Sequence, residues 1–286
     1  MDRIISLGMS RPYLLNTLLA VSASHLRHHV SSSVSYRIAE YSRQSLAIRD
    51  FRFALNEPID QPTADALLMT SIFLNMLSFS ILDEYEISDS WVFSKDDDRL
   101  DWFSLNMGLK PLLLATSEFR QDSLLRWMYD ASDDEEHKFH GEGWALDSVP
   151  SPWLKLCGLT DDSTPDHVFY EPVRILAEIK RLEPTLDSIF LYLGFFGKLD
   201  IEFRTLLVNQ DERAMWIIGL WLGLLCRYDF WWQRRRTRCD YSAIKLWLKG
   251  HIITGSHRGE EAQMWTELMR DLDMACRWPE TPTYSG

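Results

Sequence analysis

Residues 62–82 read PTADALLMTSIFLNMLSFSIL, and this stretch decides the fold class. Apolar side chains recur on nearly every side of the helix that it would form: Leu67, Leu68, Met69, Ile72, Phe73, Leu74, Met76, Leu77 and Phe79. Pro62 suits the first turn of a helix, where the backbone N–H that proline lacks has no partner. A helix without a polar face belongs at the centre of a bundle. The stretch therefore predicts a buried central helix.

A second stretch of the same kind, AMWIIGLWLGLLCRYDF, spans residues 214–230 and predicts a second buried helix. Around these two stretches the apolar residues repeat with the helical period almost everywhere. Further helices are expected from Ser10 to at least Leu26, over about 33–55, as a pair over about 99–130, and over about 167–278 with breaks near Pro184, 194–197, Asn209 and Gly250. No strand or hairpin signal is found. The chain is therefore predicted to be all-α, a single domain over 1–286 of about ten helices, with the two buried helices beside an apolar pocket.

Two segments lack this period. Residues 83–98 form an acidic stretch that holds Trp91 and Phe93. Residues 131–166 are first acidic and then rich in Gly and Pro, and they hold Trp144 and Trp153. Because large aromatic side chains gain from burial, we expect the second segment to pack down as an ordered but irregular loop.

Charge and composition exclude several classes of partner. The chain has 286 residues, with 30 Lys and Arg against 42 Asp and Glu, a formal charge of −12. Such a chain is repelled by phosphate backbones, so direct binding to nucleic acid is not expected. No stretch approaches the ~20 apolar residues that a membrane span needs, and residues 1–3 lack the pattern of a signal peptide.

The cysteines and tryptophans point to an intracellular chain with an aromatic interior. Cys226 and Cys239 are the closest pair of the four cysteines at 13 residues apart, which fits neither a CxxC metal site nor a disulfide framework. A reducing compartment, the nucleus or the cytoplasm, is therefore expected. Twelve tryptophans must fill an aromatic core or line a pocket.

One motif suggests catalysis. Residues 97–101, DDRLD, have the DDxxD form with which class I terpene cyclases hold Mg²⁺ through carboxylates on one helical face. The second metal motif of such enzymes has no full match; Asp134, Lys138 and Glu142 come nearest, with a cation in place of the hydroxyl. The favoured interpretation is an acidic loop whose carboxylates cap a helix. Asp97, Asp98 and Asp101 are catalytic candidates, and Mg²⁺ a cofactor, only if the chain is a cyclase; otherwise no catalytic residue and no cofactor is predicted.

Three other clusters were weighed, and a structural role is favoured for each. Residues 133–140 combine four carboxylates with His137 and His140, but a solvated acidic loop explains them. His25 and His29 have the spacing of metal ligands on a helix, yet histidines near a helix C-terminus are also favoured by the dipole. In residues 231–238, WWQRRRTR, the Trp pair is expected in the core and the arginines toward solvent or the acidic loops. No metal site is predicted, and no triad, Gly-rich phosphate loop or HExxH motif is present.

Several stretches, in this order and spacing, are similar to a known family. They are RPYLLNTLLAVSASHL (11–26), WVFS (91–94), DRLDW (98–102), GLKPLL (108–113), EPVRIL (171–176), FRTLL (203–207), RAM (213–215), Trp221, WWQRRRTR (231–238), AIKLWL (243–248) and WP (278–279). Over roughly residues 10–280 the chain resembles the C-terminal regulatory domain of fungal binuclear zinc cluster transcription factors, the group that includes sterol uptake control proteins.

The resemblance implies an all-α domain, often dimeric, whose apolar pocket takes a sterol or another lipophilic molecule. It also implies that residues 97–101 belong to a family loop. The family carries a six-cysteine zinc cluster that binds DNA, and this sequence does not contain one. The sequence is then either the regulatory domain of a longer factor or a free-standing relative, which could be a natural-product biosynthetic enzyme. A dimerisation module without a ligand is a third possibility.

The leading hypothesis is a domain that senses a lipophilic, sterol-like small molecule and forms a homodimer. The pocket is placed between the two most apolar helices and their aromatic neighbours. The candidate ligand-binding residues are Met69, Phe73, Met76, Phe103, Trp144, Phe195, Leu207, Trp216, Leu220 and Trp231. Trp144, Trp153 and Trp216 are the tryptophans most expected to touch a ligand, and most of the others are assigned to the scaffold.

Overall fold

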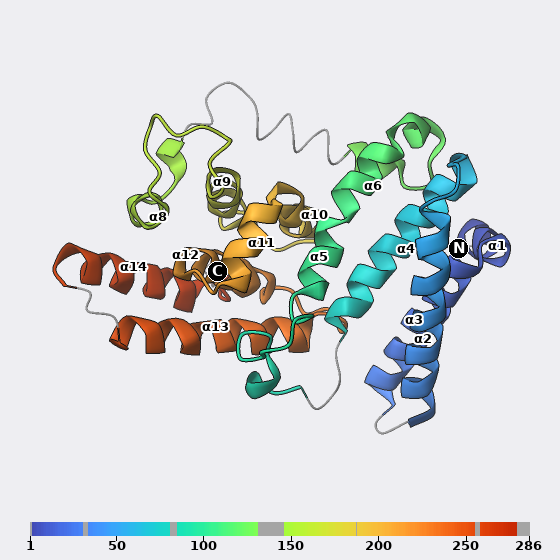
Figure 1. The fold of residues 1–286 in the computed structure, drawn as a ribbon, viewed down its shortest axis with the longest axis horizontal. Coiled ribbons are helices and arrows are strands. Elements are labelled where there is room, and N and C mark those ends of the chain that lie inside the picture. The colour runs from blue at the N-terminus through green and yellow to red at the C-terminus, as the bar shows by residue number, and fades with distance from the viewer. Residues whose placement is uncertain are drawn as a thin grey trace, which may run out of the picture. The chain divides into compact units, whose positions relative to one another are not determined.

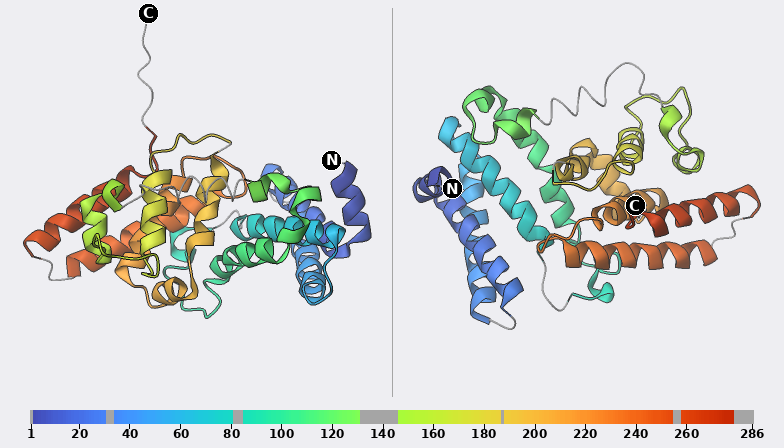
Figure 2. Two further views of the ribbon diagram at one scale, coloured as in Figure 1. Left: turned by 90° about the horizontal axis from the view of Figure 1, so that it is seen from above. Right: turned by 180° about the vertical axis from the view of Figure 1, so that it is seen from behind.

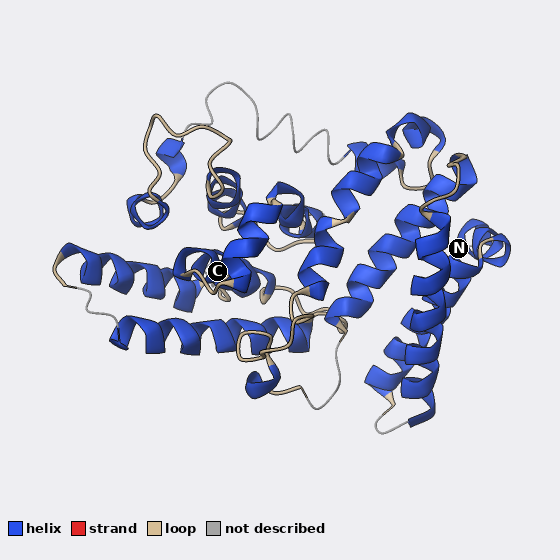
Figure 3. Ribbon diagram, in the orientation of Figure 1, coloured by secondary structure: helices blue, strands red, loops and turns tan. Residues whose placement is uncertain are grey.

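A computed structural model describes residues 2–30, 34–80, 85–130, 146–186, 188–254 and 258–278. Among these residues the regular secondary structure is helical throughout, with no strand (Figure 3). The all-α prediction is therefore confirmed. None of the helices in the described ranges has both the length and the apolar run needed to cross a bilayer.

The chain divides into two compact units. Unit 1 comprises Met1–Glu84, Leu100–Asp134 and Phe230–Arg235, and unit 2 comprises Tyr85–Arg99, Glu135–Asp229 and Arg236–Gly286. The predicted helix of residues 62–82 lies in unit 1 and the one of residues 214–230 lies almost wholly in unit 2, so each can be examined as the centre of its own unit.

Unit 1 is a bundle built around α4. Its helices are α1 (Asp2–Ser10), α2 (Pro12–His29), α3 (Val34–Ala54), α4 (Gln61–Phe79), α5 (Asp101–Met107) and α6 (Leu109–Ala115), followed by the 3₁₀ turn η2 (Ser117–Asp122). Helices α2 and α3 lie side by side (Figures 1 and 2), and α4 packs on both. The α4 helix begins as its sequence predicts, because the Asp60 carboxylate accepts a hydrogen bond of 2.9 Å from the Thr63 N–H.

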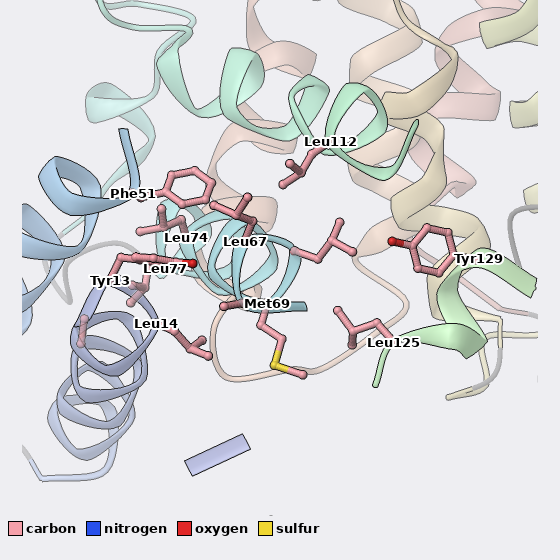
Figure 4. Packing of buried hydrophobic residues seen from close by; sticks show 13 residues of the cluster. Tyr13, Leu14, Phe51, Leu67, Met69, Leu74, Leu77, Leu112, Leu125 and Tyr129 are labelled. Carbon is pink, nitrogen blue, oxygen red and sulfur yellow. The ribbon is translucent and has the colours of Figure 1, made fainter. Parts of the chain in front are cut away.

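The core of unit 1 surrounds α4. Thirteen of the nineteen residues of this helix are buried. Its leucines and Met69 meet Tyr13 and Leu14 of α2, Phe51 of α3 and Tyr129 (Figure 4). The sequence-based assignment of this stretch as a central helix is confirmed.

Unit 2 is organised around α12. Its elements are η1 (Ile87–Asp89), η3 (Leu146–Ser148), α8 (Ser151–Cys157), α9 (Tyr170–Ile179), α10 (Ile189–Gly194), η4 (Phe195–Lys198), α11 (Ile201–Val208), α12 (Glu212–Leu225), α13 (Arg234–Thr254) and α14 (Glu260–Met274). The Asp211 carboxylate caps α12, accepting from the N–H groups of Arg213 and Ala214. Every residue of α12 from Ala214 to Leu225 is buried.

Two glycines of α12 let its neighbours approach closely. A Cβ atom on Gly219 would lie 2.7 Å from Ile244 Cγ2 of α13. A Cβ atom on Gly223 would lie 2.6 Å from the Cβ of Ala275, just after α14, and 2.8 Å from the Tyr241 ring of α13. Helix α12 therefore lies against α13 and α14 at distances that only glycine permits.

The elements differ from the predictions in three places. Helix α13 runs through Gly250 to Thr254, so the break expected at Gly250 is wrong; one exposed glycine costs a helix only about 1 kcal/mol. The helical pair expected over 99–130 is a series of short helices: α5, α6, η2 and a further helical stretch over 126–130. The segment expected to be irregular contains α8, whose Trp153 is wholly buried, as the expected packing of that segment requires.

Candidate functional site

The predicted ligand-binding residues divide between the two units. Met69, Phe73, Met76, Phe103 and Trp231 lie in unit 1, and Phe195, Leu207, Trp216 and Leu220 lie in unit 2. Trp144 lies outside the described residues, as do the acidic and histidine cluster of 133–140 and the set Asp134, Lys138 and Glu142. The candidate site is therefore considered separately in each unit.

In unit 1, three candidates line one side of α4. Met69, Phe73 and Met76 are spaced by four and three residues, which places them on one helical face. Met69 is buried in the core cluster, whereas Phe73 and Met76 are half-buried. Phe103 of α5 is fully buried. The accessible part of the predicted lining on α4 is thus Phe73 and Met76.

Three buried polar side-chain atoms of α4 have no hydrogen-bond partner among the described residues, and one of them is Nε2 of Gln61, the first residue of the helix. The Thr70 hydroxyl and the Asn75 side-chain oxygen have no hydrogen-bond partner among the described residues, although Thr70 is fully buried and Asn75 nearly so. A buried polar group without a partner costs about 1–3 kcal/mol and calls for an explanation. Thr70 is one turn from Phe73 and could receive a hydroxyl of a molecule bound there, whereas Asn75 lies about 140° around the helix from Thr70. The sequence analysis did not identify Thr70 or Asn75, because it assigned this helix from its apolar residues alone.

Trp231 lies beside the histidines at the C-terminal end of α2. Its ring centroid is 4.9 Å from that of His25 and 6.0 Å from that of His28. His25 in turn contacts His29 at 4.4 Å between ring centroids. The structure thus joins two motifs that the sequence presents far apart. Nowhere in the described ranges do three or more His, Cys, Asp or Glu side chains form a group that could hold a metal ion.

In unit 2, the candidates are packed core residues. Phe195, Leu207, Trp216 and Leu220 are each fully buried. The Trp216 indole N–H donates to the Leu268 carbonyl at 3.1 Å, and its ring meets that of Trp153 edge-on at 5.1 Å. These side chains already have apolar and polar partners within the protein.

Trp153, suspected of touching a ligand, is likewise held by the protein. Its indole N–H donates to Asp271 at 2.7 Å, and Lys180 both pairs with Asp271 at 2.9 Å and lies over the indole ring. Trp221 is similar, since its N–H donates to the Tyr192 carbonyl and its ring stacks on Phe195. The tryptophans of unit 2 described here thus hold helices together.

A buried polar cluster centres on Asp240 of α13. Its carboxylate has no exposed surface and accepts from the Tyr85 hydroxyl at 2.7 Å, from the Ser90 hydroxyl at 2.6 Å and from Arg236 Nε at 3.1 Å. Burial, and next the nearby Asp240 charge, raise the pKa of Tyr85. Arg236 was expected to face solvent or the acidic loops; it is instead buried, because it neutralises Asp240 within its own helix. The cluster anchors the segment that begins at Tyr85.

The carboxylates of the DDxxD motif do not share a helical face. Asp97 and Asp98 lie in a turn, and α5 begins only at Asp101. All three side chains are exposed. The arrangement on which the cyclase comparison depends, with carboxylates one turn apart on a helix, is therefore not formed.

One comparison with known proteins gave a match. The family described as "fungal specific transcription factor domain" matches residues 1–98. The matched range holds α1–α4 and extends into the segment before α5. No curated protein matches the chain, and neither does any solved structure.

Proposed function

We propose that this chain is a regulatory domain of a fungal-type transcription factor and responds to a lipophilic small molecule, of which a sterol is the leading candidate. The family match over residues 1–98 carries the regulatory part of the proposal. The all-helical fold agrees with it. The formal charge of −12 argues that a separate DNA-binding region, rather than this chain, contacts DNA.

The ligand would bind along α4 in unit 1. The half-buried side chains of Phe73 and Met76 would contact its apolar body, as in ligand sites lined mostly by hydrophobic and aromatic groups. Thr70, one turn from Phe73, would receive its hydroxyl, which accounts for one buried polar atom without a described partner. Trp231 would lie at the margin of the same unit. The candidates of unit 2 would then act as core.

Signalling would follow from the close packing of α4. A ligand can reach Thr70 only if the surrounding side chains part, so the free and bound chains would be two different states. Such a molecule shifts the balance only by its difference in affinity for them. We further propose that the chain acts as a homodimer in the nucleus or cytoplasm, where a regulator of this type would work.

Paired threonine variants test the ligand site. Thr70→Val removes the hydroxyl on α4 while keeping the shape of the side chain. Thr237→Val is its matched control, since Thr237 in unit 2 is also fully buried with no described partner for its hydroxyl. Ergosterol binding is measured by quenching of tryptophan fluorescence. We expect about tenfold weaker binding for Thr70→Val, equal to about 1.4 kcal/mol, and wild-type binding for Thr237→Val. Equal affinities for both variants and the wild type would place the site elsewhere.

A further inference from the structure

Helix α3 carries an apolar stripe on the side that faces away from the core of unit 1. Its buried residues are Glu40, Ala47 and Phe51. On the opposite side of the helix, exposed residues recur at spacings of four and three: Val34, Ile38, Tyr41, Ser45, Ile48 and Arg52. We call these six residues the α3 stripe. Ile38 is 62% exposed and Val34 is 57% exposed. This spacing is that of a helix that packs against another helix.

The C-terminal half of the stripe is hollowed. Ser45, Ile48, Arg49, Arg52, Phe53 and Asn56 border a shallow, open groove on the surface of this helix. Phe53 is 70% exposed at its edge. Apolar side chains of a partner could lie in this groove against Ile48 and Phe53.

The exposed charge along α3 is positive, against the sign of the whole chain. Arg37, Arg49 and Arg52 are all exposed. Neither Arg37 nor Arg52 has an ion-pair partner in the described part of the chain, and Arg49 pairs only with its neighbour Asp50. The other carboxylate of α3, Glu40, is buried against Arg27 and contributes no charge to the surface. An approaching segment therefore meets apolar side chains flanked by guanidinium groups.

We propose that this groove binds an acidic, amphipathic helix of a partner protein. Apolar residues of the partner at i, i+3/i+4 and i+7 would enter the groove and contact the α3 stripe. Its Asp or Glu residues would pair with Arg37, Arg49 and Arg52. The stripe runs over residues 34–52, or roughly 27 Å at 1.5 Å per residue, so the partner helix would have four to five turns.

Charge decides between this occupant and two others. A second copy of α3 would bring the same arginines against one another, which opposes close pairing. An anionic membrane would face the whole chain with its charge of −12, whereas a short helix meets only the positive groove. The inference does not depend on the proposed small-molecule ligand.

The test is direct binding of a designed peptide to the full chain. The probe is a fluorescein-labelled helix of about 18 residues with Leu at i, i+3/i+4 spacing and Glu elsewhere. We expect saturable binding by fluorescence anisotropy that weakens as salt is raised from roughly 50 to roughly 500 mM. The same peptide with every Glu replaced by Lys is expected not to bind.

Surface variants locate the site. The double variant R49E/R52E is expected to weaken binding at least about tenfold, and Phe53→Ala several-fold. The double variant K249E/R258E changes the net charge equally at two exposed residues of unit 2 and is expected to bind within about twofold of the wild type. Because all of these side chains are exposed, circular dichroism and melting temperature should match the wild type.

Four results would overturn the proposal. The first is no binding of the Glu peptide, and the second is equal binding of the Lys peptide. The third is an equal loss of binding in K249E/R258E. The fourth is a different occupant: R49E/R52E abolishes binding to phosphatidylserine vesicles, or converts a dimer to a monomer in light scattering, while the peptide does not bind.

Discussion

The Arg27 guanidinium of α2 and the Glu40 carboxylate of α3 form a buried ion pair, with Nε and Oε2 2.7 Å apart. Arg27 also donates to the Ser80 carbonyl just after α4 at 3.3 Å. One side chain of α2 thus links α3 and the residue that follows α4.

Removing one partner of this pair should destabilise the chain strongly. Arg27→Met would leave the Glu40 carboxylate buried without its counter-charge, and we expect a loss of about 3–5 kcal/mol in the free energy of unfolding by urea. The double variant R27M/E40L removes both charges and should recover most of that loss. An additive loss in the double variant would mean that the pair itself contributes little.

Gly223 should not tolerate a methyl group. In Gly223→Ala the new Cβ would meet Ala275 and the Tyr241 ring at under 3.0 Å, so we expect a loss of about 1–3 kcal/mol in the free energy of unfolding. Gly250→Ala in α13 is the matched control, because nothing lies within 4 Å of its Cβ. There alanine should stabilise the helix by about 0.4–1 kcal/mol. Equal effects at both positions would contradict the close helix approach in unit 2.

Stability should fall in alkaline solution. Burial raises the pKa of the Cys157 thiol to about 12, and burial also raises the pKa of Tyr228 to about 12. The folded chain then keeps protons that the unfolded chain releases above about pH 8.5 for thiols and about pH 10 for tyrosines. The protonated thiol and tyrosine therefore contribute their full stabilisation below about pH 8.5 and about pH 10, respectively. This stabilisation is lost as the pH rises toward about 12, the pKa of both groups in the folded chain.

Urea denaturation from pH 8 to pH 11 measures this dependence, with roughly 1.4 kcal/mol lost per pH unit for each group in its window. Cys157→Ala should be less stable at neutral pH but show a shallower decline between about pH 9 and 10. An unchanged slope would show that Cys157 ionises as readily in the folded chain as in the unfolded one.

The chain should not cyclise prenyl diphosphates. Asp97 and Asp98 lie in a turn before α5 and share no helical face with Asp101. Incubation with farnesyl diphosphate and Mg²⁺, analysed by mass spectrometry of organic extracts, should yield no cyclised product from the wild type or from Asp98→Ala. A product that the wild type forms and Asp98→Ala does not would revive the enzyme hypothesis.

The sequence predicted correctly those helices that depend on a short local pattern of residues. Helix α4 could be read from its all-round apolarity, and its start from Pro62. Helix α12 could be read in the same way. The predicted helix break at Gly250 was wrong because one glycine destabilises a helix only slightly. The tertiary packing of α13, the helix of twenty-one residues that contains it, stabilises the helix by more.

The site was less predictable, because apolarity does not separate core from pocket lining. Trp216 and Phe195 have the side chains expected of a ligand site, yet both are packed within unit 2. The Asp240 cluster was missed because Ser90 is 150 residues away in sequence. The contact of Trp231 with His25 likewise depends on long-range packing that no spacing reveals.

The central claim is that a lipophilic small molecule binds the folded chain, and thermal denaturation with ergosterol tests it most directly. A ligand at about 100 times its Kd stabilises the native state by about 2.7 kcal/mol, which raises Tm by about 5 °C or more in a chain of this size. We predict a rise in Tm that grows with ergosterol concentration and is reduced in Thr70→Val. A Tm that stays constant across the titration, with tryptophan fluorescence also unchanged, would contradict the claim.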